Sequence, residues 1–457
     1  MQRQALKVKA QREKARRHII DFAPLVYPSF EVTRHQSYIA ECLERAANRE
    51  SGWTRLIFHA PPQHGKSLLC SKLFPAWYRG KFPDDPIIIT AYGDDHAHSF
   101  SRFVRNTIDS REYQRIFPGV FLASDSGGVE HWDLAAPHRG EFHAAGIMGQ
   151  ITGKGAMLLV LDDPIKNRQD AESTTIRERF KDQWRSTLAT RVHANGIIIM
   201  IMTRWHEDDA AGFLIREAFP SFRYIKLSAL ADRDDILGRR YKGPLWPQRF
   251  PQPFLLNQKI QLGSYEFEAL YQGHPKPPGG FIFKRDWFTV IDKAPVGLQW
   301  CRYWDLAVST KQSADYTASL RTAVDKDGNV YYSNMIRGRW QWPDVRKKIK
   351  VTCLQNQEDW HAIEMGGTQS GMVQEMWNDE ELAGLPITGV PVTMDKKVRA
   401  IPLSARAEAG KIYLVDGDWV PDFIDEMISF DHGEHDDQVD TATGGFKMAS
   451  MGSGGIL

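Results

Sequence analysis

Four short apolar runs in the first half of the chain constrain its fold more than any other feature. They are RLIFHA at 55–60, PIIITAY at 86–92, AMLLVLDD at 156–163 and GIIIMIMT at 196–203. Each has the length of a strand and none alternates apolar with polar residues, which is typical of strands buried on both faces. Because helical patterns such as that from Glu31 to Arg49 separate the runs, we expect a parallel sheet in an α/β fold.

A change of composition marks the end of this first domain. From about 241 to 283 the chain is dense in proline and glycine, which predicts a lid or linker. Beyond it, QWCRYWDLA, YTASLRTAV and NVYYSNMIRGRW follow one another as in hairpins, before a helical pattern and the run HAIEM. We therefore expect a basic arm at 1–30, a first α/β domain at 31–240, a linker at 241–283, a second, different α/β domain at 284–450 and a tail at 451–457.

The bulk composition agrees with several packed domains and excludes other classes of protein. The chain has 457 residues, of which 42% are hydrophobic and 25% charged. No run approaches roughly 18 apolar residues and no apolar segment follows the basic N-terminus, so we expect a cytoplasmic protein without a membrane span. Four scattered cysteines predict neither a zinc site nor a disulfide framework. The basic N-terminus fits either a solvated helix or a contact with DNA.

The segment APPQHGKS at 60–67 lies between an apolar strand and a helical pattern. Such a loop binds phosphate, because backbone amides at the helix start point at the anion, a lysine reaches the β and γ oxygens, and a hydroxyl binds Mg²⁺. Only the G-K-S half fits the general motif, since Ala60 replaces its first glycine. A chance match to so short a motif is the alternative. The sequence predicts an ATP site with these loop residues: Gln63, His64, Gly65, Lys66 and Ser67.

Polar residues end two further apolar runs. Asp162 and Asp163 follow LLVL, which would bring the first carboxylate near Mg²⁺ and the second near the attacking water. The alternative is a solvated turn into Pro164. Thr203 and Arg204 end the run IIIMIM, and Thr203 is either a sensor of the γ-phosphate or a polar cap between strand and helix.

Acidic residues in the second half predict a nuclease site. Hydrolysis of a phosphodiester by two metal ions needs several carboxylates that converge on one point. Asp305 lies within the apolar run CRYWDLAV, where a buried carboxylate is costly unless it is paired or binds a metal. Glu364 follows the run HAI, although an acid at a strand end also faces solvent in many proteins. Asp436, Asp437 and Asp440 open a helix, where the helix dipole favours acids in any case.

Taken together, these motifs resemble one family. PPQHGKS, DDPIKNRQDAES and TRWHEDD are similar to the ATPase half of the large terminase subunits of tailed bacteriophages, and WDLA, IEMGG and HDDQVD to their ribonuclease-H-like nuclease half. The resemblance implies a P-loop NTPase parallel sheet followed by a ribonuclease-H-like α/β domain. It also implies ATP with Mg²⁺ on Lys66, Ser67 and Asp162, a catalytic carboxylate at Asp163, and coupling of hydrolysis to DNA movement at Thr203.

For the nuclease, the resemblance implies Mg²⁺ or Mn²⁺ on Asp305 and Glu364, with Asp436 or Asp437 as the third ligand and Asp315 as a weaker one. In the ATPase half, Gln36 stands where such motors read adenine, with an ordinary surface position as the alternative. Gln63 and Asp163 differ from the arginine and glutamate that relatives often carry. The arginine finger is therefore open between three candidates, each of which also fits an ordinary ion pair: Arg102, Arg105 and Arg139.

The resemblance implies a motor that moves double-stranded DNA into a procapsid and cuts concatemeric DNA. Its implied partners are the DNA, a small terminase subunit, a portal protein and further copies of the chain in a ring, in the host cytoplasm. Two alternatives stay open. One is an ATP-dependent nuclease of the repair or restriction type, and the other is a nucleotide-gated assembly factor without enzymatic activity whose sites have decayed.

Overall fold

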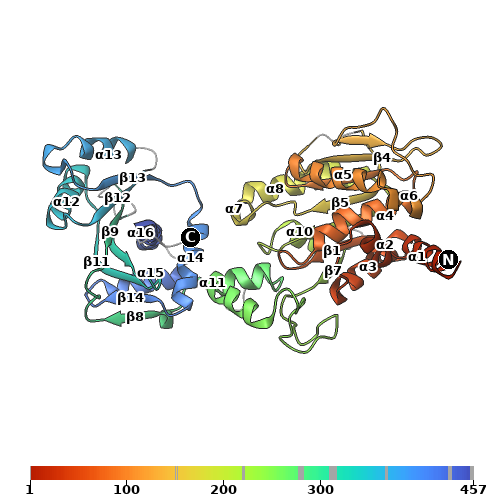
Figure 1. Ribbon diagram of the computed structural model, residues 1–457. Helices are drawn as coiled ribbons and strands as arrows, with labels where there is room; N and C mark the ends of the chain where they lie inside the picture. Colours follow the sequence, from red (N-terminus) through yellow and green to blue (C-terminus); the bar gives the residue numbers. More distant parts are fainter. Residues whose placement is uncertain are drawn as a thin grey trace. The chain divides into compact units, whose positions relative to one another are not determined.

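Two seven-stranded β-sheets form the two halves of the chain (Figure 1). The computed structural model describes residues 2–149, 151, 153–218, 222–275, 282–307, 316–365, 369–430 and 435–452. Unit 1 comprises residues 1–256 and 267–276, and unit 2 comprises 257–266 and 277–457. Each sheet carries helices on both of its faces, which confirms the expected pair of different α/β folds.

In unit 1 the strand order is β3-β4-β2-β5-β6-β1-β7, and every neighbouring pair is parallel except β3 with β4. The four apolar runs of the sequence are the adjacent strands β2, β5, β6 and β1, as expected for a sheet that is buried on both faces. The strands are β1 Arg55–His59, β2 Ile87–Ala91, β3 His131–Asp133, β4 Glu141–Gly146, β5 Ala156–Asp162, β6 Val192–Met202 and β7 Arg223–Lys226.

Successive side chains of these strands belong to two separate cores. In β5, Leu158 and Val160 pack with the helices that precede this strand, whereas Leu159 and Leu161 pack with the helices that follow it. The first group of helices is α1 Gln2–Arg17, α2 Ile19–Val26, α3 Arg34–Ala47, η1 Leu68–Leu73, α4 Phe74–Lys81, α5 Asp94–Ile108 and α6 Arg111–Ile116. The second group is α7 Arg168–Glu172, α8 Thr174–Gln183, η2 Trp184–Leu188 and α10 Ala210–Glu217. The short α9 Ala189–Arg191 follows η2 and has no buried residue.

The basic segment at the N-terminus packs on unit 1 through one side of its helix. Ala15 of α1 is buried, and its carbonyl accepts a hydrogen bond of 3.0 Å from Trp77 Nε1. Most of the lysines and arginines of α1 are exposed. The helix therefore combines a packed side with a charged, solvated side.

Unit 2 has the strand order β13-β12-β9-β10-β11-β14-β8. β9, β10 and β11 form the antiparallel succession expected from the hairpin-like sequence, and the outer strands pair in parallel. The strands are β8 Phe288–Ile291, β9 Trp300–Asp305, β10 Thr317–Val324, β11 Val330–Gly338, β12 Trp360–Met365, β13 Ile387–Pro391 and β14 Ile412–Val415. The helical segments are η3 Arg285–Trp287, α12 Trp342–Gln355, α13 Gln369–Trp377, η4 Glu380–Leu382, α14 Lys396–Glu408, α15 Val420–Ser429 and α16 Asp437–Gly452.

Helix α16 lies directly on β9 and β10 because two glycines face the sheet. A Cβ atom at Gly444 would lie 2.4 Å from the ring of Tyr303, and one at Gly445 would lie 2.4 Å from Thr322 Oγ1. Larger residues would push the helix away from the strands. This close packing brings the first turn of α16 to the end of β9 that carries Asp305.

The proline-rich segment 241–283 contains a long helix, α11 Gln252–Leu270. Gly263 interrupts it with a φ of 74°, a conformation that favours glycine. Within unit 2, the backbone N–H of Ser264 then donates to Glu408 at 2.6 Å. Among the described residues, none of the helices is both long and apolar enough to cross a membrane.

We expect the parallel core of unit 1 to respond strongly to loss of volume. Ile199 in β6 is fully buried, so Ile199→Ala should lower the free energy of unfolding by about 2–5 kcal/mol, through lost burial and the cavity left behind. Urea denaturation measures this change. Ile236→Ala is the matched control, because Ile236 is 49% exposed in the same unit, and an equal effect of both substitutions would contradict the assignment of this core.

Candidate functional site

Three neighbouring strands of unit 1 end in polar residues at the same edge of the sheet. β6 lies between β1 and β5, and all three run in parallel. The phosphate loop (60–67) follows β1, Asp162 ends β5, and Thr203 follows β6. Parallel strands bring their carboxyl ends together, so residues 137 positions apart in sequence, Lys66 and Thr203, come into contact.

The phosphate loop turns sharply before its helix. Gln63 and Gly65 have positive φ angles of 60° and 80°. A Cβ atom at Gly65 would lie 2.7 Å from Nε2 of Gln36, so only glycine fits there without displacing that side chain. Gln36 is 2% exposed and therefore belongs to the interior under the loop rather than to the surface.

Five side chains form a connected network at this edge. Lys66 Nζ donates to Thr203 Oγ1 at 2.8 Å and lies 3.8 Å from Asp163 Oδ2. The backbone N–H of Thr203 donates to Asp163 Oδ1 at 2.8 Å, and Asp163 itself has a positive φ of 40°. Ser67 Oγ donates to Asp162 Oδ1 at 3.0 Å. A lysine, two hydroxyls and two carboxylates thus lie together beside the helix start.

Asp162 is the most confined group of this network. It has no exposed surface, and burial together with the charge of Asp163 raises the pKa of its carboxyl group. Ser67 donates to one of its oxygens, and Ser71, within the π-helical segment η1, donates to the other. A buried carboxylate beside a serine hydroxyl fits Mg²⁺, which prefers oxygen ligands and whose charge would offset the cost of burial.

A cluster of aromatic rings packs against His64 of the phosphate loop. The imidazole of His64 stacks on Phe250 with ring centroids 4.4 Å apart, and His35 Nε2 lies 3.0 Å from the carbonyl oxygen of His64. Burial lowers the pKa of His64 to about 3 and that of His35 to about 4, so both rings are neutral at pH 7. The sequence motifs did not indicate Phe250 or Trp246, because these residues reach the loop from the segment expected to be a linker.

A cavity of about 500 Å³ opens beside this aromatic cluster. Its walls come from the residues before α3 and from the loop that leads to α11. The lining residues are 31–34, Arg239 and 244–248.

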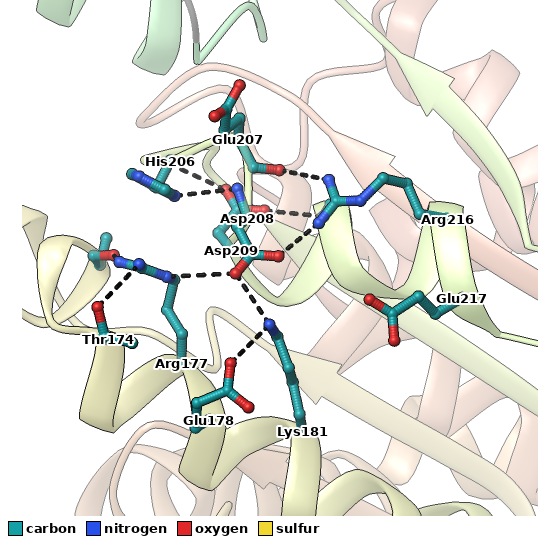
Figure 2. A network of polar contacts seen from close by, with 12 residues as sticks. Thr174, Arg177, Glu178, Lys181, His206, Glu207, Asp208, Asp209, Arg216 and Glu217 are labelled. Carbon is teal, nitrogen blue, oxygen red and sulfur yellow. Dashed lines mark hydrogen bonds and ion pairs between the residues drawn. The ribbon is translucent and has the colours of Figure 1, made fainter.

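The residues after Thr203 are fixed by ion pairs. Arg204 Nε donates to both carboxylate oxygens of Asp209, at 3.0 and 2.9 Å, and Asp209 also accepts from a backbone N–H at the start of α10. Figure 2 shows the neighbouring Asp208, which Lys181 of α8 contacts at 2.9 Å and Arg216 of α10 contacts from another side. These contacts attach the chain segment that leaves β6 to two helices.

The three candidate arginines lie in different surroundings. Arg105 donates to the carbonyl oxygens of Gly127 and Gly128, which ties α5 to that loop. The side chains of Arg102 and Arg139 are exposed.

In unit 2, carboxylates from two strands and one helix come together. Asp305 ends β9, Glu364 lies in the adjacent parallel strand β12, and Asp437 and Asp440 lie in the first turn of α16. Burial and the charges of these three neighbours raise the pKa of Asp305 well above its usual range. The family resemblance implied only Asp436 or Asp437 as the third ligand, although the helical spacing of three brings Asp440 to the same side of α16 as Asp437.

Two cations partly balance this group. Arg399 Nη2 donates to Asp440 at 2.7 Å and lies 3.6 Å, through Nη1, from Glu364. Lys396 Nζ lies 2.8 Å from Asp440 and 2.7 Å from Asp436. The side chain of Asp436 is 39% exposed, so it lies at the rim of the group.

Asp437 differs from Asp436 in its surroundings. Its side chain is 5% exposed, it accepts from the backbone N–H of Tyr316, and Arg337 lies 3.6 Å away. In the described part of the chain, no three of the nuclease carboxylates bring their oxygens within 4.8 Å of one another. Their crowding, burial and oxygen chemistry nevertheless fit a divalent metal ion, which would compensate the like charges. Asp315 and the glycines after Glu364 lie outside the described residues.

Comparisons with known proteins agree with both halves. A family model described as terminase large subunit, T4likevirus-type, N-terminal, matches residues 57–290, and one for a terminase RNaseH-like domain matches residues 302–446. No curated protein sequence matches the chain.

Among solved structures, the large terminase of a thermophilic bacteriophage (crystal form 2) is 10% identical with a TM-score of 0.51, over 90% of this chain and 97% of that one. The HK97 bacteriophage large terminase is 13% identical with a TM-score of 0.37, over 88% of each chain. The large terminase nuclease from thermophilic phage G20c with bound zinc is 16% identical with a TM-score of 0.29, over 36% of this chain and 97% of that one. Since the first family model alone matches more than half of the residues, the chain belongs to the terminase large subunit family, with an ATPase-type N-terminal domain and a ribonuclease-H-like C-terminal domain.

Proposed function

We propose that this chain hydrolyses ATP to drive double-stranded DNA into a procapsid, and that it cuts concatemeric DNA with a metal-dependent endonuclease. The observation that carries the proposal is the network of Lys66, Thr203 and the two aspartates at the edge where three parallel strands end. Membership of the terminase large subunit family supports it.

For ATP hydrolysis, we assign a role to each member of the network. Lys66 binds the β- and γ-phosphate oxygens, and the backbone amides of residues 63–67 add hydrogen bonds at the helix start. Ser67 and Asp162 would hold Mg²⁺, which neutralises charge on the phosphates when bound. Asp163 orients the attacking water.

Thr203 reports on the γ-phosphate in this proposal. Its hydroxyl accepts a hydrogen bond from Lys66, and its backbone N–H donates one to Asp163. When the Lys66 amine binds the γ-phosphate instead, Thr203 loses the first of these hydrogen bonds. Arg204 pairs with Asp209 at the start of α10, and Asp208 pairs with Lys181 of α8. These ion pairs link the change at Thr203 to both helices. The base of ATP would occupy the cavity lined by 31–34, Arg239 and 244–248, where Thr33 also contacts Gln36.

For DNA cutting, Asp305, Glu364 and Asp437 would hold Mg²⁺ or Mn²⁺, which activates the attacking water and stabilises charge on the phosphate when bound. Asp440 is a fourth acidic member. Contacts with DNA should be mainly to phosphates, since a motor passes over any sequence. We further propose that a small terminase subunit, a portal protein and further copies of the chain in a ring are its partners, in the host cytoplasm. We also propose that the chain consists of a basic arm at 1–30, a first domain at 31–240, a lid or linker at 241–283, a second domain at 284–450 and a tail at 451–457.

Loss of the phosphate-binding lysine should abolish ATP hydrolysis. Lys66→Ala is expected to lower kcat by at least about 100-fold, because it removes the buried positive charge that stabilises the transferred phosphoryl group. Phosphate release by purified protein measures the change. Lys81→Ala is the control, since Lys81 ends α4 and pairs with Asn48, and full activity in Lys66→Ala would overturn the assignment.

Loss of the central acid should abolish DNA cutting alone. Asp305→Asn is expected to stop Mn²⁺-dependent plasmid cleavage while ATP hydrolysis stays near the wild-type rate, because the two sites lie in different units. Asp327→Asn is the control, because Asp327 lies in the exposed turn between β10 and β11, and this variant should cleave the plasmid at the wild-type rate. Cleavage that survives in Asp305→Asn, or in excess EDTA, would contradict a metal-dependent site here.

The neighbouring acids of α16 should differ in their effects. Asp437→Asn and Asp440→Asn each remove a buried carboxylate of the group and should lower the rate of plasmid cleavage by about 100-fold or more. Asp436→Asn removes a half-exposed carboxylate at the rim, so we expect a loss of less than about 10-fold. Cleavage assays at saturating Mn²⁺ separate these cases, and a reversed order would refute our choice of ligands.

A further inference from the structure

The outer edge of the unit 1 sheet carries a second group of metal-binding side chains. β3 is the edge strand, and four strands separate it from β1 and the phosphate loop. In the antiparallel pair of β3 and β4, His131 lies opposite His143 and Trp132 lies opposite Phe142. Trp132 and Phe142 are buried and stacked at 4.5 Å on one face of the pair, so the two histidines lie on the other face.

Two carboxylates complete this outer face. Asp133 lies opposite Glu141, two residues along each strand from the histidines. The imidazole rings are parallel within 6°, with centroids 4.4 Å apart. His143 Nε2 lies 2.9 Å from Glu141 Oε2, and His131 Nε2 lies 3.1 Å from Asp133 Oδ1. Each strand therefore supplies one imidazole and one carboxylate in contact with each other.

The spacing of these groups is close to that of a transition-metal site. One ligand atom each from His131, Glu141 and His143 lies within 4.8 Å of the others, and within the described ranges no second set of three does so. In a tetrahedral zinc site the ligand atoms are about 3.3 Å apart, since each lies about 2.0–2.1 Å from the metal. To bind one ion, the ligand atoms would have to move closer together and the two stacked rings would have to rotate so that their planes meet at the metal.

We propose that His131, Glu141 and His143 bind a divalent transition-metal ion such as Zn²⁺ at the edge of the ATPase-type sheet. Two imidazoles and one carboxylate suit zinc and its neighbours rather than Mg²⁺. Asp133 orients His131 from behind, as carboxylates do for metal-binding imidazoles. The side chains of His131 and Glu141 are 43% and 48% exposed, which leaves a fourth position open to water.

The backbone beneath the site is already fixed. The fully buried Arg79 donates to the carbonyl oxygens of Glu141, at 2.6 Å, and of Pro83 and Asp85. Trp132 Nε1 donates to Ser101 Oγ at 2.9 Å. Ordering of the two strands is thus not a cost of metal binding. Through its bonds to His131 of β3 and to Glu141 and His143 of β4, the ion would link these two strands, of which β3 has only three residues.

Cobalt provides a direct test on the full-length protein. After treatment with EDTA and dialysis, titration with Co²⁺ should give visible absorption bands that saturate at one equivalent and disappear when Zn²⁺ is added, with a rise in Tm. His131→Gln and His143→Gln should each weaken binding by more than about 10-fold. His138→Gln, in the loop between β3 and β4, is the matched control and should bind as the wild type does.

A second variant separates this site from the nuclease acids. Asp305→Asn should keep the cobalt bands, because the nuclease site offers oxygen ligands in the other unit. The proposal is overturned if binding is lost in Asp305→Asn, if it persists in His131→Gln, or if no saturable bands form. His131 is exposed, so its substitution leaves the fold intact even where loss of the buried His143 does not.

Discussion

The buried carboxylate of Asp162 is the constraint on which the first unit depends. It ends a strand that is separated from the phosphate-loop strand by β6, yet hydroxyl groups of Ser67 and Ser71 reach it from the helix after the loop. A carboxylate without exposed surface is costly unless donors or a cation surround it. The end of β5 and the start of the helix after the phosphate loop are therefore joined through one buried group.

The second unit also contains buried carboxylates, but there several of them lie close together. Its acids come from two adjacent strands and from a helix that approaches the sheet closely, because glycines at 444 and 445 face Tyr303 and Thr322. Repulsion among the carboxylates is balanced in part by Lys396 and Arg399. The packing of α16 on the sheet thus holds the acids close together, and these two cations offset only part of their mutual repulsion. A further cation at this group would consequently be stabilised by the remaining negative charge of its acids.

The sequence predicted those parts of the structure that local pattern controls. The apolar runs around Leu159 and Ile199 could belong only to buried strands, and the polar residues at their ends had to meet at one edge. Asp440 was not selected as a ligand, because acids at a helix start are favoured by the dipole whether or not they bind metal. The contact of Phe250 with His64 depends on how a distant segment folds back, and no local pattern records it. Helix α11 likewise lies where proline and glycine had indicated only a linker.

The π-helical segment η1 has a consequence for how relatives of this chain are aligned. The backbone N–H of Phe74 reaches the carbonyl of Leu69, five residues back, so one turn holds an additional residue compared with an α-helix. Deletion of a single residue before Ser71 would restore regular α-helical winding, which leaves the later helix in register but changes the direction of the side chains within this segment. Ser71 would then turn away from Asp162. In relatives, an insertion or deletion within η1 is therefore expected to affect the contact between Ser71 and Asp162 more than a substitution at an exposed position of this segment does.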